Sequence, residues 1–230
     1  MWRWQDPFTA LYTTWKQRQL VGAYEKRIET FAPQLPSAPH GATTVEAQRT
    51  PKWSLVKRQL ASVAAVYRRS SKPGEGIARI KVPRLGLNMI VVNGTDSDSL
   101  KKGPGRDPRT YMPGQGQLVY IAGHRTTYLA PFGDIDKLRT GDRVTLELPY
   151  ATMIYVITGH RIVRADYMEA LRSRDREEVA LQACWPRFFA SHRYIAYGQP
   201  VRVILRLPGL KGMAYSYAPG GRGAAKRSIT

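Results

Sequence analysis

The chain has 230 residues, 43% of them hydrophobic, so it can bury one good core, and its length suggests one domain with extensions. The single cysteine, Cys184, excludes an internal disulfide framework. No apolar run approaches the roughly 18 residues of a membrane span, and the opening residues lack the apolar core of a signal peptide. We therefore expect either a complete soluble protein or a chain that begins after a removed anchor.

The charge is strongly positive. Lysine and arginine number 36 against 17 acidic residues, a formal net charge of +19. Such an excess favours an anionic partner, namely nucleic acid, anionic lipid or an acidic cell-wall polymer, without choosing among them. The basic residues are spread from Arg3 to Arg227, with neither zinc-finger spacing nor the signature of RNA-binding sheets. We expect a basic but ordinary surface and no nucleic-acid partner.

Helical patterns dominate the N-terminal third. Asp6 and Pro7 begin a predicted helix that runs to about Thr30. Three prolines and little apolar content predict a linker over residues 32–50. A second helix follows, and its apolar face carries Trp53, Val56, Leu60, Val63 and Tyr67. We assign residues 1–72 to a helical extension with a Pro-rich linker, and expect its first helix to be a stalk or packing helix in preference to a lid.

From Ile77 the hydrophobic period changes to two, and β-branched runs are separated by Gly, Pro and Asp turns. This spacing, with only short helical inserts, predicts a closed or nearly closed β-barrel. We assign residues 73–209 to this β domain and residues 210–230, which are basic and lack acids, to a disordered tail. The predicted strands cover residues 77–82, 88–94, 117–123, 143–148, 152–163, 178–184 and 193–207.

Cys184 ends one predicted strand, and Arg193 begins the next after the irregular loop WPRFFASH. If these strands pair as a hairpin, the two residues face one another across a short gap. A guanidinium there can hold a thiolate and later the oxyanion of a tetrahedral intermediate. Spacing alone leaves open an inert, buried cysteine.

Three histidines are candidate partners for a reactive thiol. His124 follows a strand and opens a loop, from which its side chain can reach a groove. His160 lies inside a long strand and suits a structural role. His192 precedes Arg193 and should point to the opposite face of the strand. Position therefore favours His124.

Three segments, in this order, resemble the signatures of the sortase family. Residues 100–117, LKKGPGRDPRTYMPGQGQ, resemble a loop of the class E sortases. Residues 118–142, LVYIAGHRTTYLAPFGDIDKLRTGD, are similar to the sortase histidine segment, and GHRTTY and APF recur in class E. LQACWP at residues 181–186, with Arg193 on the next strand, resembles the signature TLxTC with a following Pro and Arg. The resemblance covers about residues 77–208.

This resemblance implies a mainly β protein with the closed eight-stranded sortase-type barrel, and a cysteine transpeptidase. Cys184 would attack the carbonyl of the threonine in a C-terminal sorting signal. His124 would protonate the departing glycine amine, and Arg193 would steady the thiolate and oxyanion. A peptidoglycan precursor or cross-bridge amine would then resolve the thioester.

The implied partners are secreted proteins that bear such a signal. The implied location is the extracytoplasmic face of the membrane of a Gram-positive bacterium, with an N-terminal anchor that this chain lacks. Its 25 arginines against 11 lysines would suit a high-GC genome.

The same resemblance suggests Tyr128, Thr126 and Ala183 as substrate-binding residues. In class E, a tyrosine at this place accompanies Leu-Ala-x-Thr-Gly signals in place of Leu-Pro-x-Thr-Gly. A phenol oxygen can accept the N–H that proline lacks, although a ring that only packs within its loop is the alternative. Ala183 stands where the signature has threonine, and Arg106-Asp107 replaces a usual His-Tyr pair.

We expect neither a metal nor another cofactor. The spacing of Asp134, Asp136 and Asp142 is better explained by helix and turn capping than by calcium binding. Two other functions stay open. A hydrolytic cysteine peptidase would share the nucleophile and histidine but release an acid. A non-catalytic basic module would bind an anionic polymer, with an affinity that falls steeply with salt.

Overall fold

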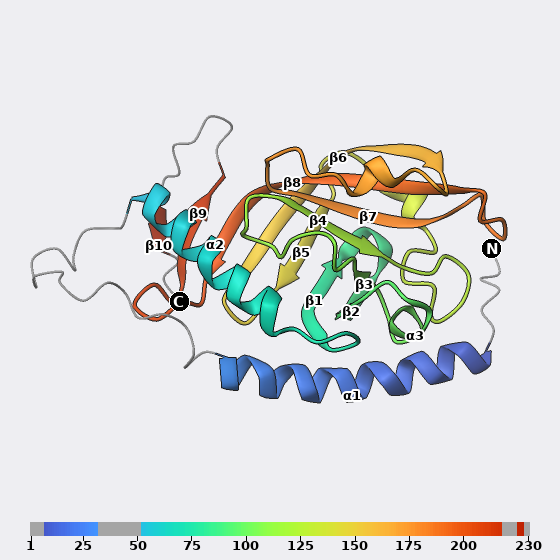
Figure 1. The fold of residues 1–230 in the computed structure, drawn as a ribbon, viewed down its shortest axis with the longest axis horizontal. Helices are drawn as coiled ribbons and strands as arrows, with labels where there is room; N and C mark the ends of the chain where they lie inside the picture. Colours follow the sequence, from blue (N-terminus) through green and yellow to red (C-terminus); the bar gives the residue numbers. More distant parts are fainter. Residues whose placement is uncertain (1–6, 32–51, 218–224, 228–230) are drawn as a thin grey trace, which may run out of the picture.

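The computed structural model describes residues 7–31, 52–217 and 225–227. Figure 1 shows a β-barrel with helix α1 along its outside. The helices are α1 (Pro7–Phe31), α2 (Trp53–Ser70) and α3 (Ser97–Leu100), with 3-10 turns η3 (Pro83–Leu85), η4 (Ile135–Lys137) and η5 (Met168–Leu171). The strands are β1 (Gly76–Val82), β2 (Leu87–Asn93), β3 (Gly105–Arg106), β4 (Leu118–Ala122), β5 (Arg143–Glu147), β6 (Ala151–Arg164), β7 (Glu178–Trp185), β8 (His192–Leu205), β9 (Met213–Ser216) and β10 (Ala225–Arg227).

Eight of the described strands close into a barrel. Their order is β8-β6-β5-β1-β2-β3-β4-β7, and β7 pairs again with β8 to complete the circle. Most neighbours are antiparallel, whereas β2 with β3 and β4 with β7 are parallel. The predicted closed eight-stranded barrel is therefore confirmed. Strands β9 and β10 extend the sheet from β8, outside the closed circle.

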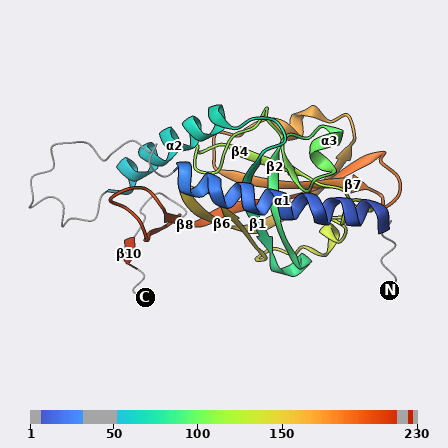
Figure 2. The same ribbon diagram turned by 90° about the horizontal axis from the view of Figure 1, so that it is seen from below.

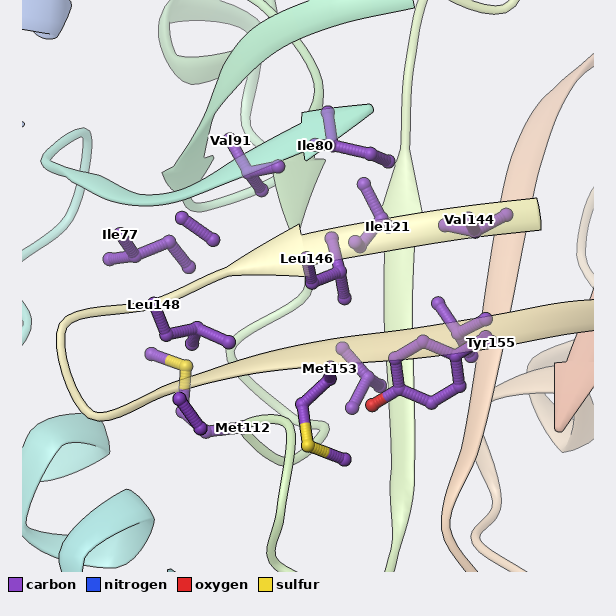
Figure 3. Packing of buried hydrophobic residues seen from close by; sticks show 14 of the residues in the cluster. Ile77, Ile80, Val91, Met112, Ile121, Val144, Leu146, Leu148, Met153 and Tyr155 are labelled. Carbon is purple, nitrogen blue, oxygen red and sulfur yellow. The ribbon is translucent and has the colours of Figure 1, made fainter. Parts of the chain in front are cut away.

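The hydrophobic core fills the inside of the barrel. Figure 3 shows Ile80, Ile121, Leu146 and Tyr155, which come from four different strands, within this core. The inward side chains of each strand alternate with outward ones, as the period of two predicts. Burial of each aliphatic side chain contributes roughly 1.5–3 kcal/mol, so the core holds the strand ends in fixed register.

Helix α2 buries the face that its sequence predicts. Val56, Leu60, Val63 and Tyr67 are each at most 1% exposed, and the Tyr67 hydroxyl donates to the Ile77 carbonyl at 2.9 Å. The helix therefore belongs to the same core as the barrel.

Helix α1 crosses the outside of β1 and β2 (Figure 2). Gln17 fastens it to β2, because its amide accepts from the Ile90 N–H at 2.7 Å and donates to the Ile90 carbonyl at 3.0 Å. Thr13 donates to the Lys101 carbonyl at 2.8 Å. These bonds satisfy backbone groups of β2 and of the turn that follows α3, so α1 is a packing helix. None of the helices described here is both long and apolar enough for a bilayer span.

Two regions differ from the prediction. Strand β3 was not expected, because it has only two residues within a glycine-rich loop. Strand β9 lies within the predicted tail, where Tyr215 is buried and stacks on Trp53 with 5.1 Å between ring centres. The prediction of a disordered tail from residue 210 is therefore wrong for residues 213–216, because aromatic packing orders β9. The predicted linker, and residues 218–224 and 228–230 of the tail, lie outside the described part of the chain.

Candidate active site

Strands β4, β7 and β8 bring the three predicted catalytic residues to one end of the barrel. Cys184 near the end of β7 is in register with Arg193 at the start of β8. His124 lies two residues beyond the end of β4, which runs parallel to β7. Alternation along β7 places Gln182 and Cys184 on the outer face and sends Ala183 into the core.

A cavity of about 280 Å³ lies on this outer face, and Cys184, His124 and Arg193 all line it. Its other walls come from the segments after β2 and β3, from β4, and from the end of β6 with the connection to β7. Its polar lining groups are Thr95, Asp107, Arg109, Tyr120, Tyr167 and Gln182. Its apolar lining groups are Leu100, Ala122, Val163, Ala165, Met168, Ala170 and Leu171, together with Gly123. The mixed lining suits a peptide with small and apolar side chains.

His124 is held in its neutral form by its surroundings. Burial lowers the pKa of the imidazole below its usual value. Its Nε2 atom is buried and has no hydrogen-bond partner among the described residues. The ring packs against Tyr128 with 4.9 Å between ring centres. This environment favours an imidazole that takes a proton only transiently.

Cys184 is a half-buried free thiol. Arg193 is its cross-strand partner and lines the same cavity, and its guanidinium is fixed because Nη1 donates to the Ala190 carbonyl at 2.8 Å and to the His192 carbonyl at 3.0 Å. These bonds use backbone acceptors, which leaves the positive charge of Arg193 uncompensated by a carboxylate among the described residues. A cation in this position stabilises a thiolate or an oxyanion.

The other two candidate histidines lie outside the cavity. His160 stacks on Tyr194, with ring centres 4.9 Å apart and planes at 11°. His192 is exposed, and its Nδ1 lies 3.0 Å from the Ser191 hydroxyl. The geometry thus singles out His124 among the three.

The predicted substrate-binding residues do not line this cavity. Ala183 is fully buried in the barrel core, so the predicted side-chain contact with a substrate is not supported. Thr126 is half-buried in the loop after His124. Tyr128 lines a neighbouring hollow of about 360 Å³ between this loop and α1. Its backbone N–H donates to the Thr9 hydroxyl at 3.3 Å. No residue of the described α1 lines the catalytic cavity.

The six polar residues that line the cavity beside the predicted catalytic residues were not found by sequence reasoning, and four of them are of note. Gln182 and Tyr120 could have been found by stepping back two and four residues from Cys184 and His124 along their strands. The other two are Asp107 and Arg109, which form an ion pair with 2.7 Å between Arg109 Nη2 and Asp107 Oδ2. Burial alone would raise the pKa of Asp107, but the hydrogen bonds and charge of Arg109 outweigh it and lower the pKa.

The three aspartates considered for calcium are instead in ion pairs. Asp134 pairs with Lys137 and Arg187, Asp136 with Arg125, and Asp142 with Arg84. Within the described residues, no group of three or more His, Cys, Asp or Glu side chains is placed to hold a metal ion.

Comparisons with known proteins agree on one family. A model of the sortase domain matches residues 80–201. Sortase D of Bacillus subtilis (strain 168) is 33% identical over 138 residues, 57% of this chain and 68% of that protein. Sortase SrtE1 of Streptomyces coelicolor is 26% identical over 148 residues, 57% of this chain and 42% of that protein. The structure of sortase E from Streptomyces avermitilis matches with 33% identity and a TM-score of 0.52, covering 57% of this chain and 91% of that one.

Proposed function

We propose a substrate and a role for each site residue of this chain, which belongs to the sortase family of cysteine transpeptidases. The chain cleaves a C-terminal sorting signal between threonine and glycine, and joins the new threonine carboxyl end to a cell-wall amine. The observation that carries this proposal is the convergence of Cys184, His124 and Arg193 on one cavity.

The reaction proceeds in two balanced steps. The Cys184 thiolate attacks the threonine carbonyl, the C–N bond to glycine breaks, and the imidazolium of His124 gives its proton to the leaving amine. The acceptor amine then attacks the thioester, His124 takes a proton from it, and the thiolate leaves. Arg193 stabilises the oxyanion in both steps. Because burial lowers the pKa of His124, its imidazolium form is a minor, working fraction of the enzyme.

Within the family, we assign the chain to class E and its signal to the Leu-Ala-x-Thr-Gly type. The segment GHRTTYLAPF, residues 123–132, supports the class, as do the matches to two Streptomyces class E sortases. The match to a sortase D supports the family in general, and is as high in identity as the better class E match.

The proposed place of action is the extracytoplasmic face of the membrane of a high-GC Gram-positive bacterium. Sortases act at the cell surface of Gram-positive bacteria. The proposed partners are secreted proteins with the signal, and a peptidoglycan precursor or cross-bridge amine. The net charge of +19 suits work beside anionic wall and lipid polymers.

The test mixes the chain with Leu-Ala-x-Thr-Gly and Leu-Pro-x-Thr-Gly peptides and a small amine such as triglycine. Mass spectrometry should find the new amide between threonine and the amine. Cleavage that yields only the free acid at saturating amine would favour the hydrolytic peptidase. Cleavage of neither peptide would overturn the proposed substrate.

A further inference from the structure

The pairing between β4 and β7 ends before it reaches the two proposed reacting residues, His124 and Cys184. The last rung between β4 and β7 pairs Ala122 with Gln182, and the Gly123 N–H adds one bond to the Gln182 carbonyl at 2.9 Å. His124 and Cys184 lie beyond this rung, at places that the parallel register would set opposite each other. Some other contact must therefore fix the spacing of these two residues.

One such contact comes from Arg125, the residue after His124. Its side chain is only 4% exposed. Nη1 donates to the Cys184 carbonyl at 3.3 Å, and Nη2 lies 2.9 Å from Asp136 Oδ1. The guanidinium carbon is 4.4 Å from the centre of the Trp185 ring. The Arg125 side chain thus contacts both strand β7, through the Cys184 carbonyl, and its own loop, through Asp136.

A second contact runs in the opposite direction. Arg187 follows Cys184 in the loop between β7 and β8, and its Nη2 donates to the Gly133 carbonyl and lies 3.1 Å from Asp134 Oδ1. Each segment therefore sends one arginine to the other. In Arg125 the planar fork serves two acceptors, one from Nη1 and one from Nη2, in directions that an ammonium group does not fix.

Stability alone does not account for this arrangement. Burial lowers the pKa of Arg125, while the charge of Asp136 acts against this effect. The Nε atom of Arg125 is buried, with no hydrogen-bond partner among the described residues. A buried donor without an acceptor is costly, and the ion pair offsets little of this cost because the Asp136 side chain is 38% exposed. Groups retained at such a cost next to a reactive site are candidates for a functional role.

We propose that Arg125 and Arg187 are positioning residues that hold His124 and Cys184 at the spacing the reaction needs. Neither touches the reacting atoms. The inference rests on the proposed function for the identity of the reacting pair. Misplacement by about 1 Å can reduce a rate by a hundredfold, so small movements of either segment should be visible in turnover.

The experiment compares Arg125→Gln, Arg125→Lys and Arg187→Gln with the unmodified chain. A matched control is Arg27→Gln, because Arg27 also joins two segments by bonds to Glu75 and Ser71, but these connect α1 with the turn between α2 and β1. Turnover and KM are measured with peptide and amine, stability by thermal melting, and accessibility of Cys184 by its rate of alkylation with iodoacetamide at fixed pH.

We expect Arg125→Gln and Arg187→Gln to lower kcat at least tenfold, to change KM less than threefold, and to alter the alkylation rate at least threefold. Arg125→Lys should recover less than a third of the loss, since it keeps the charge but not the fork. Arg27→Gln should melt at a lower temperature and keep the kcat of the unmodified chain.

Two results would overturn the proposal: kcat values within twofold of the unmodified chain for both glutamine variants, or losses that Arg27→Gln reproduces at equal melting temperature. If Arg125→Gln fails to fold, Arg187→Gln decides alone, since the Arg187 side chain is 36% exposed.

If the unmodified chain joins no peptide to the amine, the proposed function fails. The alkylation rates then decide the positioning role, and rates within threefold of the unmodified chain reject it.

Discussion

Cys184 and Arg193 are direct cross-strand partners, joined through the antiparallel register of β7 and β8 one rung from its end. On one face of a sheet, directly opposed side chains lie close enough to interact. The hairpin thus delivers a thiol and a guanidinium to the same cavity.

Replacement of the thiol should separate chemistry from folding. Cys184→Ala removes the atom that forms the thioester and leaves a small side chain in a half-buried place. We expect a melting temperature near that of the unmodified chain and no peptide cleavage. Measurable amide formation by purified Cys184→Ala would show that another group is the nucleophile.

The partner arginine should resist even a conservative change. Arg193→Lys keeps a positive charge but loses the fork that is fixed by the Ala190 and His192 carbonyls. We expect a loss of about a hundredfold in turnover, as for other lost oxyanion donors. The control is Arg202→Lys on the exposed part of β8, which should keep full turnover. Equal turnover of both variants would show that Arg193 does not stabilise the thiolate or the oxyanion.

The sequence predicted those parts of the site whose residues lie close together along the chain. Cys184 and Arg193 are separated by a short loop, so a hairpin was the simplest connection and their pairing was predictable. His124 was found because it directly follows a strand. The family resemblance suggests a substrate contact for Ala183, whereas the period of two along β7 sends its side chain into the core, where the structure has it.

Longer-range contacts could not be read from the sequence. Arg125 contacts Cys184, 59 positions away, through a backbone carbonyl that leaves no pattern in the side chains. Gln17 satisfies both backbone groups of Ile90 across 73 positions in the same way. Strand β9 depends on the stacking of Tyr215 on Trp53, which requires the α2 position to be known first. The hydrophobic patterns of the sequence predicted the helices and strands, whereas tertiary packing determined which distant elements contact one another.

Three substitutions to glutamine separate the histidines. His124→Gln should abolish turnover and change stability little. His160→Gln removes a ring stacked on Tyr194, so it should lower stability by about 0.5–1 kcal/mol and keep turnover. His192→Gln, at an exposed position, should change neither. Turnover and chemical unfolding are measured on all three variants. Full turnover of His124→Gln together with lost turnover of His160→Gln would contradict the proposed location of the active site.

Acid should weaken the fold partly through His124. Burial lowers the pKa of His124 in the folded chain, so between the ordinary value of about 6.5 and this lower value the unfolded state binds more protons. The free energy of unfolding therefore falls as pH drops through this window. The stability of the unmodified chain relative to His124→Gln should be constant above about pH 7.5 and should decline from pH 7 to 5, by less than the ~1.4 kcal/mol per pH unit that one proton allows. A difference independent of pH would contradict the burial effect.

The last prediction concerns the second position of the sorting signal. Tyr128 packs its ring on His124 and lines the hollow beside α1, next to the catalytic cavity. A peptide that reaches this wall with alanine at its second position keeps a backbone N–H for the phenol oxygen, directly or through a water. Proline lacks this N–H, and an unpaired acceptor disfavours it by roughly 1–3 kcal/mol.

In competition at equal concentrations, the Leu-Ala-x-Thr-Gly peptide should therefore be used about tenfold faster than the Leu-Pro-x-Thr-Gly peptide, since ~1.4 kcal/mol is one decade. Tyr128→Phe should reduce the preference below threefold and retain turnover, because the ring contact with His124 is kept. Tyr12→Phe is the matched control, since Tyr12 lines the same hollow from α1 and should leave the preference unchanged. Equal use of both peptides by the unmodified chain would remove the class E substrate proposal. The roles of Cys184, His124 and Arg193 would not depend on that result, because they act on the threonine carbonyl that both signals share.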